Sequence, residues 1–195
     1  MSLFVAIRPP ESAREDLQDA IDRVRKPLEP VKLHWQPADR WHVTVAFLGE
    51  QDDEADDRAA ACIDAVAAST DPLTLRLGGA GSFGRQVLWV GIQGLDEGAG
   101  AGFTALAGAI QSGLRNRGFS LEKRPWHPHL TVARTRGTDA RAAVDYLTGY
   151  VGPRWVLPDL VVIRSDGGPN PRHTVVHSAP ITPSGDHPSG DDPGA

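Results

Sequence analysis

Apolar and polar residues alternate in several short stretches of this chain, a pattern typical of β-strands with one buried face. The two clearest stretches are residues 41–47, Trp-His-Val-Thr-Val-Ala-Phe, and residues 128–134, Pro-His-Leu-Thr-Val-Ala-Arg. Residues two apart share a face of a strand, so each copy places His, Thr and Ala on one face and apolar residues on the other. Strict alternation assigns Phe47 and Arg134 to the apolar face. The sequence thus predicts two strands that each pack into a core and present His, then Thr, on the open side.

Seven further strands are predicted near residues 3–7, 32–35, 73–77, 87–92, 119–123, 160–164 and 173–179. Apolar residues at helical spacing predict four helices, which carry residues 13–24, 55–66, 103–114 and 144–147. Ser12 and Glu15 form a capping box at the start of the first helix, and Thr138 is the predicted cap of the fourth. The Gly-rich segment 78–84 lacks the Lys-Ser/Thr ending of a phosphate loop, so we interpret it as a turn.

This order of elements predicts an α+β fold with an internal duplication. Each half contributes one H-x-T strand, which explains both the repeat and its spacing. We expect a bilobal arrangement in which two antiparallel β-sheets face a central cleft and the helices pack outside. Residues 1–181 are predicted to form this single domain. Residues 182–195 are rich in Pro, Gly, Ser and Asp and are predicted to be a disordered tail.

Composition narrows the class of protein. The chain has 195 residues, of which 40% are hydrophobic and 23% charged, as is ordinary for a soluble globular protein. Its apolar runs are too short to span a bilayer, and no basic segment followed by an apolar stretch precedes the first strand. Cys62 is the only cysteine, which excludes an intramolecular disulfide. We expect a cytoplasmic protein with no membrane association, and nothing in the sequence indicates an obligate protein partner.

Charge is unevenly distributed, although the net charge is −5. Residues 50–57 contain six acids and no base, whereas residues 115–141, around the second H-x-T, contain seven Lys or Arg and two acids. This local excess is either a solvated basic face or an attraction for phosphate. It favours a small or terminal phosphate ligand over the broad contact that a duplex binder makes.

Two His and two Thr on open strand faces suit phosphoester chemistry. Displacement at phosphorus needs one group that takes a proton from the nucleophile and one that gives a proton to the leaving oxygen. Histidine performs both roles near neutral pH, so His42 and His129 are the candidate catalysts. Thr44 and Thr131 are candidate donors to the phosphate oxygens. A single His on a strand is more often structural, but two matching copies 87 residues apart strengthen the catalytic interpretation.

Other residues have two interpretations. Trp126 or Phe4 can stack on a nucleobase, and packing in the core or at a hinge is the alternative for both. Four histidines could also be interpreted as metal ligands, but no carboxylate accompanies them at a metal-ligand spacing. These four are His127, His129, His173 and His177. We expect no metal and no cofactor.

The two strand motifs resemble the paired signatures of the two-histidine phosphoesterase superfamily, and most closely its RNA 2′,3′-cyclic phosphodiesterase group, also called 2′–5′ RNA ligase-like proteins. The likeness also covers Leu-Phe-Val-Ala at 3–6, Trp35, Gly-Ser-Phe at 81–83 and Arg-Pro at 124–125. It implies a bilobal α+β fold and metal-independent opening of a 2′,3′-cyclic phosphate to a 2′-phosphate. It also implies that His129 activates water, His42 protonates the 3′ oxygen, Thr44 and Thr131 hold the phosphate, and Arg134 assists them.

The resemblance has one departure and leaves two alternatives. Family members carry a Tyr after the Gly-Pro near the C-terminus, but here Gly168-Pro169 is followed by His173. Arg134 needs a bulge, twist or strand end to reach the open face. The partners implied are RNA ends or nucleotides with a 2′,3′-cyclic phosphate. The alternatives are a module that binds such ends without turnover, and reversible 2′–5′ joining of RNA.

Overall fold

The computed structural model describes residues 1–95, 99–168 and 171–182 of the chain. The tail predicted over residues 182–195 therefore lies, apart from residue 182, outside the described residues. No helix in the described part of the chain is both long and apolar enough to cross a bilayer.

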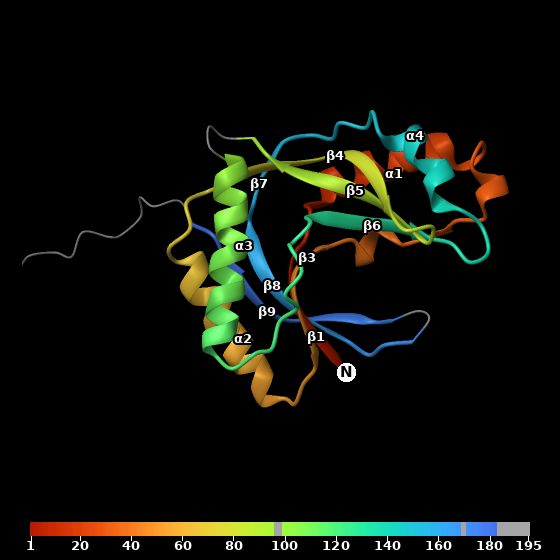
Figure 1. The fold of residues 1–195 in the computed structure, drawn as a ribbon. Helices are drawn as coiled ribbons and strands as arrows, with labels where there is room; N and C mark the ends of the chain where they lie inside the picture. The colour runs from red at the N-terminus through yellow and green to blue at the C-terminus, as the bar shows by residue number, and fades with distance from the viewer. Residues whose placement is uncertain (96–98, 169–170, 183–195) are drawn as a thin grey trace, which may run out of the picture.

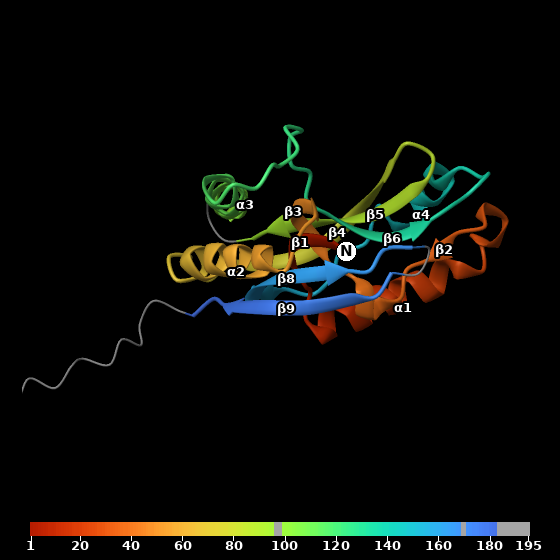
Figure 2. The same ribbon diagram turned by 90° about the horizontal axis from the view of Figure 1, so that it is seen from below.

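Nine strands form one curled antiparallel sheet (Figures 1 and 2). In chain order they are β1 (Ser2–Ile7), β2 (His34–Trp35), β3 (Val43–Glu50), β4 (Thr74–Phe83), β5 (Val87–Gly94), β6 (His129–Arg134), β7 (Trp155–Val156), β8 (Asp159–Ser165) and β9 (His173–Pro180). Their order in space is β7-β4-β5-β6-β3-β1-β8-β9, and β2 pairs with β6. The two H-x-T strands, β3 and β6, are therefore neighbours at the centre of the sheet.

Four α-helices pack on the two halves of this sheet: α1 (Glu11–Arg25), α2 (Glu54–Ala67), α3 (Ala99–Asn116) and α4 (Val144–Leu147). Helix α2 packs on β8 and β9 and against α3, whereas α1 and α4 contact β4 (Figure 1). Single 3₁₀ turns cover residues 29–31, 38–40 and 140–143. Helix α3 contacts both β3 and β5 and so lies across the join between the two halves.

The two halves meet at one hydrogen-bonded residue pair. Strands β3 and β6 pair antiparallel only at Val43 and Leu130, the middle residues of the two H-x-T motifs. The prediction of two facing sheets differs from the structure here, because this pair joins the halves into one sheet. In the register of an antiparallel pair, it sets His42 opposite Thr131 and Thr44 opposite His129. The two motifs are consequently related by a local two-fold arrangement.

Several local predictions need correction. Helix α1 begins at Glu11, with Pro10 at its N-cap and no side-chain cap, so the Ser12–Glu15 box does not start it. Thr138 does not cap the last helix: its hydroxyl donates to the Val31 carbonyl, Asp139 caps the 3₁₀ turn at 140–143, and α4 then begins without a side-chain cap. The predicted strand at residues 119–123 is irregular. These misassignments lie outside the two H-x-T strands.

Residues 78–83 of the Gly-rich segment are strand rather than turn, because β4 continues to Phe83, and only Gly84 lies in the turn that follows. The reason lies in the ring of Trp89 on the neighbouring strand. A Cβ added at Gly81 would lie 2.2 Å from a carbon of that ring, so only glycine lets the two strands pair there. Gly81 thereby fixes the place of Trp89, which packs beside the second H-x-T motif.

Candidate functional site

Both H-x-T motifs line one cavity of about 530 Å³ at the join between β3 and β6. His42, Thr44, His129 and Thr131 all face it, together with side chains from β1, β9 and the turn before β3. Each of the four is partly exposed, whereas the residues between and beside them, such as Val43 and Leu130, are fully buried. The alternation seen in the sequence therefore produces the face that was expected, up to the Thr of each motif.

The alternation breaks at the same place in both strands. β3 has a register shift against β1 at Val45, and β6 has one against β5 at Val132. The extra residue is a β-bulge, which reverses the side-chain direction that follows it. Ala46 and Ala133 are consequently buried, not on the open face as the pattern predicted.

Phe47 and Arg134 are turned outward by these bulges. Strict alternation placed both in the core, but Phe47 is 53% exposed and Arg134 is exposed, and both line the cavity. The two residues occupy equivalent positions, five after the His of each motif. One repeat therefore adds an aromatic ring to the cavity wall where the other adds a guanidinium group.

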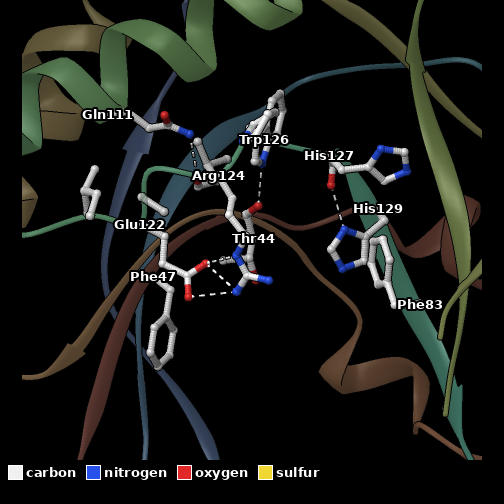
Figure 3. A pocket seen from close by; sticks show the side chains of 13 residues that line it. Thr44, Phe47, Phe83, Gln111, Glu122, Arg124, Trp126, His127 and His129 are labelled. Carbon is white, nitrogen blue, oxygen red and sulfur yellow. Dashed lines mark hydrogen bonds and ion pairs between the residues drawn. The ribbon is translucent and has the colours of Figure 1, made fainter.

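Each catalytic candidate is oriented by a backbone carbonyl two residues earlier. Nδ1 of His42 lies 2.7 Å from the Arg40 carbonyl oxygen, and Nδ1 of His129 lies 2.7 Å from that of His127 (Figure 3). A carbonyl oxygen only accepts, so in both rings Nδ1 carries the proton and donates it. This fixes the tautomer, and Nε2 is the atom that remains for a ligand.

Burial lowers the pKa of both imidazoles. The pKa of His42 falls to about 4, chiefly because burial disfavours the charged ring, although the bond to the Arg40 carbonyl opposes this. Positive charge on His173 and His129 lowers the pKa of His42 further. Burial also lowers the pKa of His129. At neutral pH each resting ring is thus neutral, with a lone pair on Nε2.

The two histidine rings pack against different aromatic side chains. The ring of His42 lies 4.9 Å from Phe4 and 5.1 Å from His173, measured between centroids. The ring of His129 lies 4.6 Å from Phe83 in an edge-to-face arrangement and 6.3 Å from Trp89. Each imidazole thus has two aromatic side chains beside it.

The two stacking candidates have structural contacts. Phe4 is 5% exposed and packs on His42, so little of its ring is accessible. Trp126 donates its Nε1–H to the Thr44 carbonyl at 2.9 Å and lies edge-on to Phe103, which fixes its ring beside the first motif. It lines a second cavity of about 450 Å³, which shares Thr44, Phe47 and His129 with the first (Figure 3).

No group of three or more His, Cys, Asp or Glu side chains with the arrangement of a metal site occurs among the described residues. Of the four histidines considered above, His177 instead has its Nε2 2.7 Å from the Asp64 carboxylate. His173 packs on His42.

Sequence comparison places the chain in a family. Residues 9–169 match the 2′-5′ RNA ligase superfamily. The chain belongs to this superfamily. A relative from Thermus thermophilus, named RNA 2′,3′-cyclic phosphodiesterase, is 30% identical over 191 residues, which cover 90% of this chain and 88% of the relative. A relative of the same name from Geobacillus stearothermophilus is 28% identical over 153 residues. That match covers 75% of this chain but only 47% of the relative.

Solved structures share the fold of this superfamily member. The crystal structure of TT0787 from Thermus thermophilus has a TM-score of 0.76 and 24% identity, covering 94% of this chain and 100% of that one. E. coli LigT complexed with 3′-AMP has a TM-score of 0.69 and 24% identity, covering 93% and 98%. These likenesses show the α+β fold with its curled antiparallel sheet.

Some residues of this superfamily member reach the cavity without having been singled out from the sequence. Phe83 is 40% exposed and lines the second cavity, of about 450 Å³, beside His129. Arg40 and Arg136 line the H-x-T cavity with Arg134, and none of the three takes part in an ion pair between described residues. The basic excess over residues 115–141 was the one signal that included Arg136. Nothing marked Arg40, which reaches the cavity from the 3₁₀ turn before β3.

Proposed function

We propose that the protein hydrolyses 2′,3′-cyclic phosphates at the ends of RNA or on nucleotides, without a metal ion, and leaves a 2′-phosphate. The observation that carries the proposal is the pair of His residues on one cavity, each with Nδ1 bonded to a carbonyl and Nε2 left for the substrate. The names of the curated relatives support this activity.

The reaction follows from the two ring nitrogens. Water attacks phosphorus while Nε2 of His129 takes a proton from it, and the bond from phosphorus to the 3′ oxygen breaks on the opposite side. Nε2–H of His42 protonates that oxygen. The products are a 3′-hydroxyl and a 2′-phosphate, and the proton gained by His129 returns through solvent to His42.

His42 must carry a proton that it lacks at rest, since burial holds its pKa at about 4. Bound substrate raises the pKa of His42, because an anionic phosphate beside a buried imidazole stabilises the protonated ring. His42 is therefore charged in the complex rather than in the free protein. Thr44 and Thr131 donate to the non-bridging oxygens, and Arg134 balances their charge.

The direct test is phosphorus NMR on a 2′,3′-cyclic nucleotide incubated with purified protein in excess EDTA. The proposal predicts turnover and a 2′-phosphate resonance. A 3′-phosphate product would reverse the assigned roles, and activity that EDTA abolishes would contradict metal independence. Tight binding of the cyclic phosphate without product would instead indicate a binding module.

Joining of RNA ends is the second candidate, favoured by the superfamily to which the chain belongs. It is the reverse reaction with a 5′-hydroxyl in place of water, and microscopic reversibility allows it at the same His pair. Incubating 2′,3′-cyclic phosphate and 5′-hydroxyl RNA ends at high concentration, followed by a digest that spares 2′–5′ linkages, tests for it.

A further inference from the structure

A third cavity, of about 810 Å³, opens from the H-x-T cavity along β2 and the end of β6. Its volume is in the range of cavities that hold small ligands. Gln36, Arg40, Arg134 and Arg136 line both cavities, so the two adjoin. A ligand whose reacting phosphate lies between the His residues can therefore extend into this space.

The wall of this cavity is strongly basic. Four arginines line it, and none of the described residues that line it is acidic. They come from three separate segments: Arg25 ends α1, Arg40 precedes β3, and Arg134 and Arg136 lie at and just after the end of β6. Such convergence in a chain of net charge −5 indicates an anionic ligand with more than one phosphate group.

Arg25 is the outermost of the four, because it lines this cavity and not the H-x-T cavity. Its guanidinium carbon lies 5.4 Å from the centre of the Trp35 ring, and its Nε is 2.6 Å from the Asp22 carboxylate. These two contacts hold the group at the cavity wall. Its charge is shared with Asp22, whereas Arg40, Arg134 and Arg136 have no ion pair with a described residue.

We propose that this four-arginine cavity binds the phosphodiester on the 5′ side of the terminal nucleotide, so that the enzyme is built for oligonucleotide ends rather than free cyclic mononucleotides. This inference rests on the proposed function of the H-x-T cavity. In an RNA end the 2′,3′-cyclic phosphate and the upstream phosphodiester are attached to the same ribose. A chain held between His42 and His129 thus has a second phosphate close enough to enter the adjoining cavity.

The experiment compares kcat/KM for three substrates that end in the same nucleoside 2′,3′-cyclic phosphate: the mononucleotide, its 5′-phosphorylated form and the dinucleotide. Arg25→Gln removes one cation of the cavity without touching the H-x-T cavity. Arg23→Gln is the matched control, since Arg23 is an exposed residue of the same helix that lines neither cavity. Because the variant removes one charge-assisted contact to the upstream phosphate, we expect Arg25→Gln to lower kcat/KM for the dinucleotide about tenfold.

The mononucleotide separates the outcomes. Its turnover should be unchanged by Arg25→Gln, whereas kcat/KM for the dinucleotide should fall less steeply with salt in that variant than in wild type. If the 5′-phosphorylated mononucleotide gains as much kcat/KM over the mononucleotide as the dinucleotide does, the cavity binds the phosphate alone. If the dinucleotide gains more, the cavity also contacts the rest of the upstream nucleotide. Equal loss on mononucleotide and dinucleotide, or loss on neither, overturns the inference while leaving the proposed function standing. If wild type turns over none of the three, the proposed function fails, and binding of a dinucleotide 2′-phosphate to wild type and Arg25→Gln still decides the cavity.

Discussion

The two H-x-T strands, β3 and β6, have the same backbone conformation but different neighbouring side chains. Each presents His and Thr to one cavity, bulges at the following Val and buries the next Ala. After the bulge, β3 presents Phe47 and β6 presents Arg134. A repeated backbone device thus gives a cavity with one aromatic wall and one cationic wall, which suits a ligand that has a base at one side and phosphates at the other.

The two imidazoles differ in the same way. His42 is enclosed by Phe4 and His173, and its pKa falls to about 4. The pKa of His129 is also lowered by burial. This ring, however, lines both the H-x-T cavity and the second cavity, beside Trp126, and is therefore the more accessible of the two imidazoles. An accessible neutral ring suits a base that must meet water. In the proposed reaction, an enclosed ring that gains its charge beside a phosphate suits an acid that acts once substrate is bound.

The largest effect is expected from removal of either imidazole. His42→Ala and His129→Ala should each lower kcat for a 2′,3′-cyclic phosphate by about 10²–10⁴-fold, since each removes one proton transfer. His177→Ala is the control, because this His lies on β9, pairs with Asp64 of α2 and does not line the H-x-T cavity. Full activity in either cavity variant would remove that His from the mechanism.

A p-nitrophenyl phosphodiester separates the two roles. Its leaving group departs without a proton, so it has little need of a general acid. His42→Ala should regain much of its lost activity on this substrate, relative to wild type, and His129→Ala should not. The opposite pattern would exchange the acid and the base between the two repeats.

The stability of the fold should depend on pH through His42. Its folded pKa of about 4 lies below the unfolded value of about 6.5, so the unfolded chain binds more protons between these values. Stability is then complete above pH 6.5 and is lost as the pH falls toward 4, by up to about 3 kcal/mol. Urea unfolding at several pH values measures this, and His42→Gln should flatten the curve in that window. An unchanged slope in the variant would show that His42 is not the group that titrates.

Replacement of the hydroxyls tests whether the repeats hold the phosphate equally. Thr44→Val and Thr131→Val keep the shape and remove one donor each, so each should lower kcat/KM by about 10- to 100-fold. Similar losses are expected because the two hydroxyls face one cavity from paired strands. A loss confined to one variant would mean that only one repeat contacts the phosphate.

The smallest effects should distinguish the two walls. Arg134→Gln should weaken inhibition by inorganic phosphate and by a nucleoside 2′-phosphate alike, about tenfold. Phe47→Ala should weaken only the nucleotide, since loss of base stacking costs about 1–3 kcal/mol. Val156→Ala, at an exposed apolar position of β7, is the control. Equal weakening of both inhibitors in Phe47→Ala would contradict a base-binding wall.

Alternation predicted the strands and the open faces of the H-x-T motifs, because two-residue periodicity depends only on neighbours along the chain. It failed after Val45 and Val132, where an extra residue reverses the pattern. A bulge is set by register against a partner strand, so the outward turn of Phe47 and the burial of Ala46 are not visible locally. The family resemblance suggests a bulge at Arg134, whereas nothing in the sequence suggests one before Phe47.

Contacts between segments that are distant along the chain could also not be predicted from the sequence. The join at Val43 and Leu130 depends on the meeting of strands 87 residues apart, which a repeat suggests but does not position. The contact between Gly81 and the Trp89 ring was equally unpredictable. It explains why glycine lies within a strand in a segment whose composition is typical of a turn. Arg40 reaches the cavity through a 3₁₀ turn that has no sequence pattern of its own.

The most direct measurement is an NMR titration of the imidazole nitrogens with a nucleoside 2′-phosphate. If one phosphate lies between the repeats, the Nε2 signals of His42 and His129 will shift together with a single dissociation constant, while His177 stays unchanged. Movement of only one of the two cavity signals, or two separate dissociation constants, would contradict the account.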